Sequence, residues 1–248
     1  MTLVPIFGRT LELQDLQQMF SNGRSFLVHG PAGVGKTLLV KHLEPEIPQM
    51  LYCRDSSSGQ IAFRSLLAAL FAKKNQRVMK VFGANSENAI GQKSAVAVRG
   101  IVDDALQEGR YWILLDHVQS PSQSFSGALK DLSNRTETPI VAVVRSAHME
   151  DAGFLLPMFS DRSQKYSLRN FDPATATEFA AQVCREVQLH ALNRDEVIEK
   201  IVAYSKGNPG AIVAMLQMAT RSKYAAREHV KLAPLYIDFR LGQGTIYG

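Results

Sequence analysis

Eight consecutive residues near the N-terminus have the types and spacing of a phosphate-binding loop. They are Gly30, Pro31, Ala32, Gly33, Val34, Gly35, Lys36 and Thr37. This phosphate loop follows an expected strand and opens an expected helix that continues with Leu38, which is the context the pattern requires. Its glycines let backbone N–H groups surround a polyphosphate, and the helix N-terminus adds positive potential. We expect Lys36 to reach the β- and γ-phosphates and the Thr37 hydroxyl to ligate Mg²⁺.

A second candidate metal ligand ends the apolar run 111–115. Asp116 would lie at the C-terminal tip of a buried strand, where its carboxylate can hold Mg²⁺ through water. The next residue is His117. Many ATPases that combine a phosphate loop with such an aspartate carry an acidic residue at this position, where it orients the attacking water. A neutral imidazole could position that water or sense the γ-phosphate. Equally, His117 could be an ordinary polar strand end, and hydrolysis would then be slow.

Short apolar runs alternate with helical patterns through the first two thirds of the chain. The expected strands are 26–28, 50–53, 111–115, 140–144 and 166–168. The expected helices between them are 11–20, 36–43, 61–74, 95–107 and 124–132. Strands that are apolar on both faces and alternate with helices predict an α/β fold, with a parallel sheet of about five strands flanked by helices.

The pattern changes after residue 170. Asp172 and Pro173 are typical of a helix N-cap followed by proline at the first helical position, which opens a helix over 174–189. Two more helices are expected over 195–204 and 211–223. We therefore expect a P-loop ATPase core over 1–169, a small all-helical lid over 170–225 and a C-terminal tail over 226–248. From residue 231 the tail could form a short strand, followed by a loose end.

Three further segments resemble the AAA+ and STAND branches of P-loop ATPases. Residues 6–16, which include Phe7, Gly8 and Arg9, are similar to the FGRxxEL segment of origin-recognition and STAND ATPases. Residues 139–146 are similar to their sensor strand. Residues 205–212 are similar to the Gly-x-Pro segment of the helical lid. The motifs occur in the same order as in these families, and the resemblance covers about residues 5–220.

The resemblance implies a role for each of these segments. Residues 7–9 would pack beside the adenine, and Pro209 would lie against the base. Arg145 would contact the γ-phosphate and report its presence. Arg162 occupies a position where AAA+ proteins often place an arginine that reaches the γ-phosphate of a neighbouring subunit, although a surface arginine fits equally well. The ligands implied are ATP or ADP with Mg²⁺.

The motifs favour a regulatory ATPase that uses Mg-ATP binding, and slow hydrolysis, to switch its conformation or assembly. Such a protein would act through self-association or a partner protein. Because the sequence stops soon after the lid, we expect either a separate effector chain or a longer parent protein. Two alternatives stay open, namely a DNA-associated oligomeric ATPase of the transposition-regulator or replication-loader type, and an ATP-stabilised scaffold that does not hydrolyse.

The charge of the chain is uneven. Its 28 Lys and Arg exceed its 23 Asp and Glu by five. Residues 54–80, here called the cationic segment, hold six cations against Asp55 alone, and these are Arg54, Arg64, Lys73, Lys74, Arg77 and Lys80. This segment, and residues 221–227, could contact DNA phosphates. A solvated helix face is the more common explanation of such a segment, so DNA is a possible partner but not the favoured one.

Composition excludes several other classes of protein. The chain is 46% hydrophobic and 21% charged, as is ordinary for a globular protein. No apolar run approaches the roughly 18–20 residues of a transmembrane helix, and the N-terminus lacks the layout of a signal peptide. Cys53 and Cys184 lie in apolar surroundings far apart in the chain, so we expect core thiols in a reducing cytoplasm.

Overall fold

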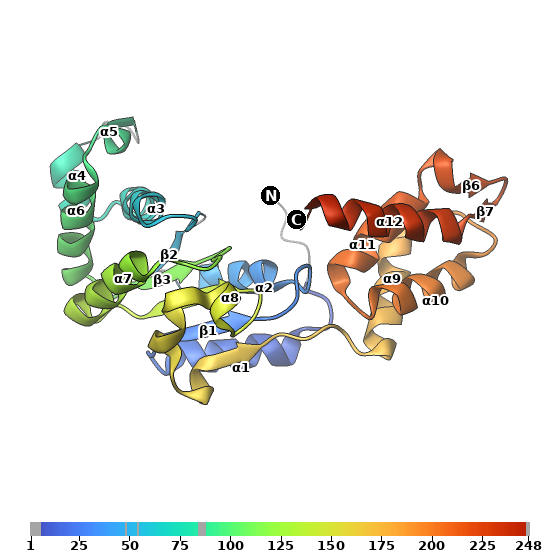
Figure 1. Ribbon diagram of the computed structural model, residues 1–248, viewed down its shortest axis with the longest axis horizontal. Helices are drawn as coiled ribbons and strands as arrows, with labels where there is room; N and C mark the ends of the chain where they lie inside the picture. The colour runs from blue at the N-terminus through green and yellow to red at the C-terminus, as the bar shows by residue number, and fades with distance from the viewer. Residues whose placement is uncertain (1–5, 48, 54, 84–87, 247–248) are drawn as a thin grey trace. The chain divides into compact units, whose positions relative to one another are not determined.

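The computed structural model describes residues 6–47, 49–53, 55–83 and 88–246. The chain forms two compact units (Figure 1). The sheet unit comprises residues 11–30 and 36–168. The helical unit comprises the described residues of 1–10, 31–35 and 169–248, so its members are not continuous in sequence.

The sheet unit is built on five parallel strands. They are β1 (Phe26–His29), β2 (Met50–Cys53), β3 (Trp112–Leu115), β4 (Ile140–Val144) and β5 (Lys165–Ser167). Their order in the sheet is β2-β3-β4-β1-β5, which makes β1 and β3 the neighbours of β4. All four strand pairs are parallel. The expected α/β fold with a parallel sheet of about five strands is therefore confirmed.

Helix α1 (Thr10–Ser21) precedes the first strand, and further helices connect the strands, as parallel pairing requires. The connecting helices are α2 (Lys36–Leu43), α3 (Gly59–Ala72), α4 (Gln76–Phe82), α5 (Asn88–Gly91), α6 (Ala95–Gln107), α7 (Gln123–Thr136) and α8 (Met149–Ala152). Short 3₁₀ turns occupy Glu44–Glu46, Gly153–Phe159 and Arg162–Gln164. No helix within the described ranges is both long and apolar enough to cross a bilayer.

Helices α4 and α5 were not expected from the sequence. Helix α4 is only seven residues long and carries two cations, so its apolar period is hard to recognise. It depends on a local cap, because the Asn75 side chain accepts hydrogen bonds from the backbone N–H groups of Arg77 and Val78 at 3.0 and 3.1 Å. A short helix that forms through its cap and its packing leaves little periodic signal.

Both faces of the sheet are buried. On one face, Leu51 of β2, Ile113 of β3 and Ala142 of β4 belong to the apolar core that also contains the inward residues of α3, α6 and α7. On the other face, the ring of Phe20 in α1 packs against Phe26 and Trp112, with centroids 5.0 and 4.8 Å away. Double burial explains why each strand is a nearly continuous apolar run.

The helical unit contains four longer helices (Figure 1). They are α9 (Pro173–Glu186), α10 (Arg194–Ser205), α11 (Pro209–Ala219) and α12 (Leu232–Ile246). Two strands of two residues each, β6 (Ala225–Ala226) and β7 (His229–Val230), form an antiparallel hairpin before α12. The expected cap of α9 is confirmed, because the Asp172 side chain accepts from the N–H groups of Ala174 and Thr175.

The expectation of a strand near the C-terminus is wrong, because residues 232–246 form α12. Leu235 and Phe239, four positions apart, are buried in the core of the helical unit. This spacing puts both side chains on one helix face. The preceding Tyr224 donates a hydrogen bond to Asp238 at 2.8 Å, which ties the helix to the turn before it. Tertiary packing therefore decides the conformation of a segment whose local pattern is ambiguous.

Candidate nucleotide-binding site

The sheet unit holds the last two residues of the phosphate loop. Lys36 and Thr37 begin α2, a few positions after the end of β1. The ammonium of Lys36 donates to the carbonyl of Gly30 at 2.6 Å, so the side chain folds back over the loop. The hydroxyl of Thr37 donates to Oδ1 of Asp116 at 3.1 Å. The structure thus brings together the two predicted metal ligands and the predicted phosphate-binding lysine.

Asp116 is held by residues that the sequence did not point to. Its carboxylate is 1% exposed, and its Oδ2 accepts a hydrogen bond from the hydroxyl of Tyr52 at 2.8 Å. Its own backbone carbonyl accepts from the hydroxyl of Ser56 at 2.7 Å. Tyr52 lies in β2 and Ser56 follows it, and both reach Asp116 because β2 and β3 are neighbours. One feature of the sequence could have indicated Tyr52, namely that it carries a hydroxyl near the C-terminal end of an otherwise apolar strand.

His117 adopts a backbone conformation that is unusual for a residue with a side chain. Its φ is +52°, in the left-handed region. Its N–H donates to Oδ1 of Asp116 at 2.9 Å, and its Nε2 lies 3.6 Å from Oδ2. The side chain is 67% exposed. The imidazole therefore lies beside the carboxylate and open to solvent, in a conformation of the kind that recurs at functional sites.

Positive charge gathers around the end of β1. Burial lowers the pKa of Lys36, Asp116 and Asp151 oppose that shift, Arg145 adds to it, and the resulting pKa is about 8. Burial also lowers the pKa of His29, with smaller effects from His148, Lys36 and Lys165. Arg145 itself is exposed, and its carbonyl accepts the N–H of Gly30 at 3.1 Å. A site where cations depress one another's pKa values suits a polyanionic ligand.

The middle of the phosphate loop belongs to the helical unit. Residues 32, 33 and 34 each have their backbone carbonyl held by a different donor in that unit. Ala32 O accepts from Nδ2 of Asn208 at 2.9 Å, and Gly33 O accepts from the N–H of Gly210 at 2.9 Å. Val34 O accepts from Nη2 of Arg9 at 3.3 Å. The sequence did not predict a loop held by its carbonyl groups.

The segment around Phe7 packs against the start of α9. The Phe7 ring lies 5.5 Å from Phe179 and 6.4 Å from Phe171, measured between centroids. The guanidinium of Arg9 is buried, lies 4.3 Å from the Phe171 ring centroid and donates to the carbonyl of Arg169 at 2.8 Å. Gly8 sits between these residues with φ of +63°. Contact of residues 7–9 with adenine stays a prediction.

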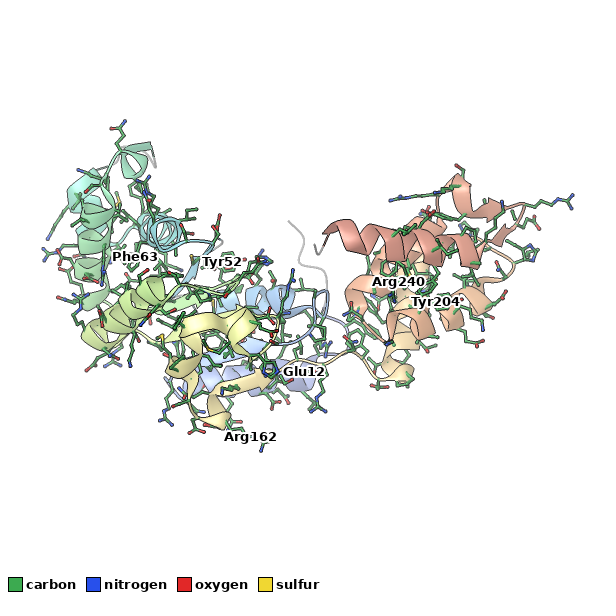
Figure 2. The ribbon with its side chains drawn as sticks, viewed as in Figure 1. Glu12, Tyr52, Phe63, Arg162, Tyr204 and Arg240 are labelled. Atoms are coloured by element: carbon green, nitrogen blue, oxygen red, sulfur yellow. The ribbon has the colours of Figure 1, made fainter. Side chains whose placement is uncertain are left out.

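Three other predicted site residues are placed as follows. Pro209 is the first residue of α11, directly after Asn208. Leu38, on the first turn of α2, is 43% exposed. Arg162 begins the 3₁₀ turn before β5, where it is exposed at the surface of the sheet unit (Figure 2). The roles assigned to Pro209 against the base and to Arg162 in a neighbouring subunit stay predictions.

The residues present fit a magnesium nucleotide. Thr37 and Asp116 offer hydroxyl and carboxylate oxygens, the hard donors that Mg²⁺ prefers, and their oxygens lie 3.1 Å apart. Gly33 and Gly35 have φ of +76° and +100°, the conformation in which successive N–H groups form an anion-binding nest.

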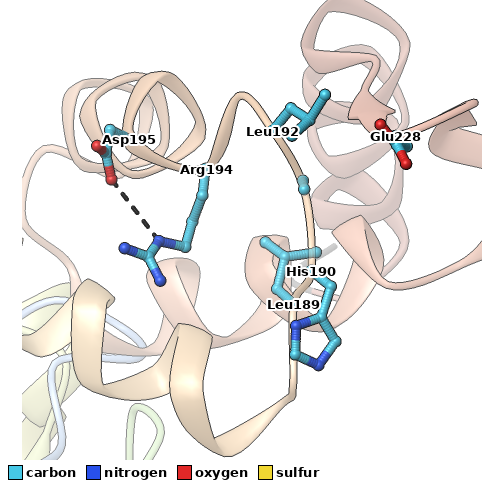
Figure 3. A pocket seen from close by; sticks show the side chains of 7 residues that line it. Leu189, His190, Leu192, Arg194, Asp195 and Glu228 are labelled. Atoms are coloured by element: carbon cyan, nitrogen blue, oxygen red, sulfur yellow. Dashed lines mark ion pairs between the residues drawn. The ribbon is translucent and has the colours of Figure 1, made fainter.

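A separate cavity of about 450 Å³ opens on the helical unit (Figure 3). Its lining residues are Leu189, His190, Ala191, Leu192, Arg194, Asp195 and Glu228. Arg194 and Asp195 form an ion pair across 3.6 Å within its wall. The lining includes none of the residues that hold the phosphate loop.

The profile of a family described as "AAA ATPase domain" matches residues 5–148, which is more than half of the chain. The chain belongs to the AAA ATPase domain family. It is therefore a nucleotide-binding ATPase domain with a P-loop. No curated protein matches the sequence significantly.

Solved structures share the fold of this AAA ATPase domain. A Walker-type ATPase of Pyrococcus abyssi is 20% identical, with a TM-score of 0.61, over 97% of this chain and 73% of that one. The ORC1 protein of Aeropyrum pernix in complex with DNA is 14% identical, with a TM-score of 0.63, over 96% of this chain and 66% of that one. Cdc6p from Pyrobaculum aerophilum is 14% identical, with a TM-score of 0.53, over 92% and 67%.

Proposed function

We propose that this AAA ATPase domain is a Mg-ATP-dependent switch that hydrolyses ATP slowly. The observation that carries the proposal is the hydrogen bond between Thr37 and Asp116, with the Lys36 ammonium folded over the same loop. This arrangement gathers a cation for the phosphates and two oxygen donors for Mg²⁺ at one edge of the sheet.

Each residue has a distinct task in this proposal. Lys36 and the backbone N–H groups of the phosphate loop bind and orient the phosphates. Thr37 and Asp116 would hold Mg²⁺, which supplies charge neutralisation at the β- and γ-phosphates when it is bound. Arg145 would contact the γ-phosphate. Arg145 is an exposed residue directly after β4, and departure of the γ-phosphate would end that contact.

We attribute slow hydrolysis to His117, which stands where many ATPases with a phosphate loop carry an acidic residue. A general base contributes about 10²–10⁴-fold to a rate when it is positioned on the attacking group. The residue after Asp116 carries an imidazole in place of a carboxylate, and its Nε2 lies 3.6 Å from Asp116 Oδ2. We infer that the domain keeps the γ-phosphate for long periods, as a switch requires.

The switch would act through the γ-phosphate. Its departure would end the contact with Arg145 and remove negative charge from the phosphate loop. ATP and ADP would then favour different conformations, or different assemblies, of the protein.

The first test is binding of ATP to the wild type and to Lys36→Ala. The variant should lose measurable ATP binding in a titration calorimeter, and undiminished affinity would refute the site. The steady-state ATPase rate then separates a slow enzyme from a scaffold that binds without turnover. Light scattering with ATP and with ADP tests nucleotide-dependent assembly with itself, and a pull-down with each nucleotide tests a partner protein.

DNA association is a second candidate, supported by exposed lysines of the cationic segment. Lys73 and Lys74 are exposed just before α4, Lys80 is exposed in its last turn, and the fold neighbour ORC1 was solved with DNA. Two arginines of the segment contact other groups of the sheet unit. Arg64 donates to the carbonyls of residues 91 and 93, and Arg77 lies 3.4 Å from a carboxylate oxygen of residue 108. Arg54 lies outside the described residues.

Fluorescence anisotropy with a labelled duplex across a salt series tests this candidate. Phosphate contacts must weaken as salt rises. In a plot of the logarithm of the binding constant against the logarithm of the salt concentration, replacing Lys73 and Lys74 by glutamine should make the slope shallower. The slope should fall by about one for each DNA phosphate that the variant no longer neutralises. Binding that does not change with salt, or no binding at low salt, would argue against DNA association.

A further inference from the structure

The side chain of Asn208 joins three segments of the helical unit. Its Nδ2 donates to Ala32 O in the phosphate loop at 2.9 Å and to Oδ1 of Asn170 at 3.1 Å. Its Oδ1 accepts the N–H of Ala211 at 3.1 Å and so caps α11. An amide has two N–H donors, and here two acceptors are in reach. One side chain therefore fixes the loop relative to the first turn of a lid helix.

The bond to Ala32 controls a neighbouring N–H group. In a trans peptide the carbonyl of one residue and the N–H of the next point in opposite directions. Holding Ala32 O toward Asn208 therefore turns the N–H of Gly33 away from the lid helix. Arg9 holds Val34 O in the same way, at 3.3 Å, and so turns the N–H of Gly35. A phosphate loop binds its ligand through such glycine N–H groups.

The loop and α11 also touch directly. The N–H of Gly210 donates to Gly33 O at 2.9 Å. A Cβ added to Gly210 would lie 2.9 Å from both Cα and O of Gly33, so only glycine permits this approach. A Cβ on Gly33 would lie 2.7 Å from Oδ1 of Asn208. A shift of the first turn of α11 must therefore disturb the loop.

We propose that Asn208 is a positioning residue that couples the lid helix α11 to the phosphate loop through the carbonyl of Ala32. With this bond in place the loop keeps its phosphate-binding form. Without it the peptide between Ala32 and Gly33 is free to rotate, and ATP binds more weakly. Because coupling is reciprocal, bound phosphate strengthens the seating of α11 on the loop. The inference rests on the proposed function, in which this loop binds ATP.

Two substitutions separate positioning from helix capping. Asn208→Ser and Asn208→Asp both keep an oxygen that can cap α11, and both are good N-cap residues. Neither keeps the amide donor for Ala32. The serine variant adds no charge, so it removes any effect of an acidic group near phosphate.

Asn193 provides a matched control in the same unit. Its Nδ2 donates to Val230 O at 3.2 Å and its Oδ1 accepts the N–H of Val230 at 2.9 Å. Asn193→Ser and Asn193→Asp therefore remove a similar amide-to-carbonyl bond that does not involve the phosphate loop. Comparing the two pairs separates a loss of general packing from a loss of loop geometry.

The measurements are the Kd for Mg-ATP and for Mg-ADP, the thermal midpoint, and deuterium exchange of the loop amides without nucleotide. We expect both Asn208 variants to bind ATP about tenfold more weakly, the loss of one well-placed hydrogen bond. We also expect their loop amides to exchange faster, with thermal midpoints like those of the Asn193 variants. The Asn193 variants should bind like the wild type.

Two results would overturn the inference, and they differ in what else they reject. If the wild type binds ATP and both Asn208 variants bind within twofold of it, the coupling is wrong and the proposed function survives. If the wild type binds no ATP at all, the proposed function fails and the inference fails with it. If the Asn208 variants bind ATP more weakly and their loop amides exchange faster, while the Asn193 variants behave like the wild type, the coupling and the proposed function are both supported.

Discussion

The hydroxyl of Thr37 and the carboxylate of Asp116 meet at 3.1 Å, although 79 positions separate them in the chain. One residue begins α2 and the other follows β3. They meet because β1 and β3 both pair with β4, with their C-terminal ends on the same edge of the sheet. Two hard oxygen donors therefore meet at this edge, as the proposed magnesium site requires.

Asp116→Asn should weaken magnesium binding and leave the phosphate loop intact. The amide keeps the shape of the side chain but lacks the charge that attracts the cation. We expect the Mg²⁺ concentration at half-maximal ATPase rate to rise by about 10- to 100-fold, a size typical of weakened metal sites. A magnesium titration at saturating ATP measures this. An unchanged magnesium requirement would contradict the assignment, and ATP binding in EDTA serves as the control.

His117→Glu should raise the turnover number. If the imidazole is what keeps hydrolysis slow, a carboxylate at this exposed position can orient and deprotonate a water molecule, which is worth up to about 10²–10⁴-fold. Steady-state phosphate release at saturating Mg-ATP measures the effect. His117→Ala is the control, because it removes the imidazole without adding a base. A rate for the glutamate variant at or below that of the wild type would eliminate this explanation of slow hydrolysis.

Gly210→Ala should fail to stabilise the protein although the residue lies in a helix. Replacing glycine by alanine inside a helix ordinarily gains about 1 kcal/mol. Here the new Cβ would lie 2.9 Å from Gly33 Cα and O, so we expect no gain in thermal midpoint and weaker ATP binding. Gly100→Ala in α6 is the matched control, because nothing lies within 4 Å of its added Cβ. A rise in midpoint for both variants alike would disprove the close approach.

Arg162 should matter only when molecules assemble, if it acts on a neighbouring subunit. The specific ATPase activity of the wild type should then rise with protein concentration, and Arg162→Ala should abolish the rise. Mixing Arg162→Ala with Lys36→Ala should restore part of the activity, since one chain supplies the arginine and the other the nucleotide. Arg110→Ala, at another exposed arginine of the sheet unit, is the control. Activity per molecule that is independent of concentration would argue for a plain surface arginine.

Neither cysteine should react with a thiol reagent at pH 8 in the folded protein. Both thiols are free and buried. Burial raises the pKa of Cys53 to about 11, and it also raises the pKa of Cys184. Below its raised pKa each thiol keeps its proton, so the reactive thiolate is scarce at pH 8 and grows only at more alkaline pH. Ellman's reagent should detect two thiols per chain in the protein unfolded by guanidinium and none in the folded protein. Fast reaction of the folded protein would contradict this prediction.

Much of the fold could be predicted from local pattern. The strands of the sheet are short apolar runs because both faces are buried, and the cap at Asp172 is a local hydrogen-bond motif. Helix α12 could not be predicted this way. Its apolar residues are held by the rest of the helical unit, and residues 232–246 alone suit more than one conformation. Local propensity is a weak guide wherever distant packing decides.

The sequence by itself determined the phosphate loop and its ligand chemistry, because residues 30–37 are neighbours in the chain and their types and spacing are those of a phosphate-binding loop. Tertiary structure decided which groups hold that site in shape. Tyr52 reaches Asp116 because β2 pairs with β3, and Asn208 reaches Ala32 because α11 packs on the loop. Such contacts join residues far apart in the chain, so they depend on strand order and helix packing, which no local spacing encodes.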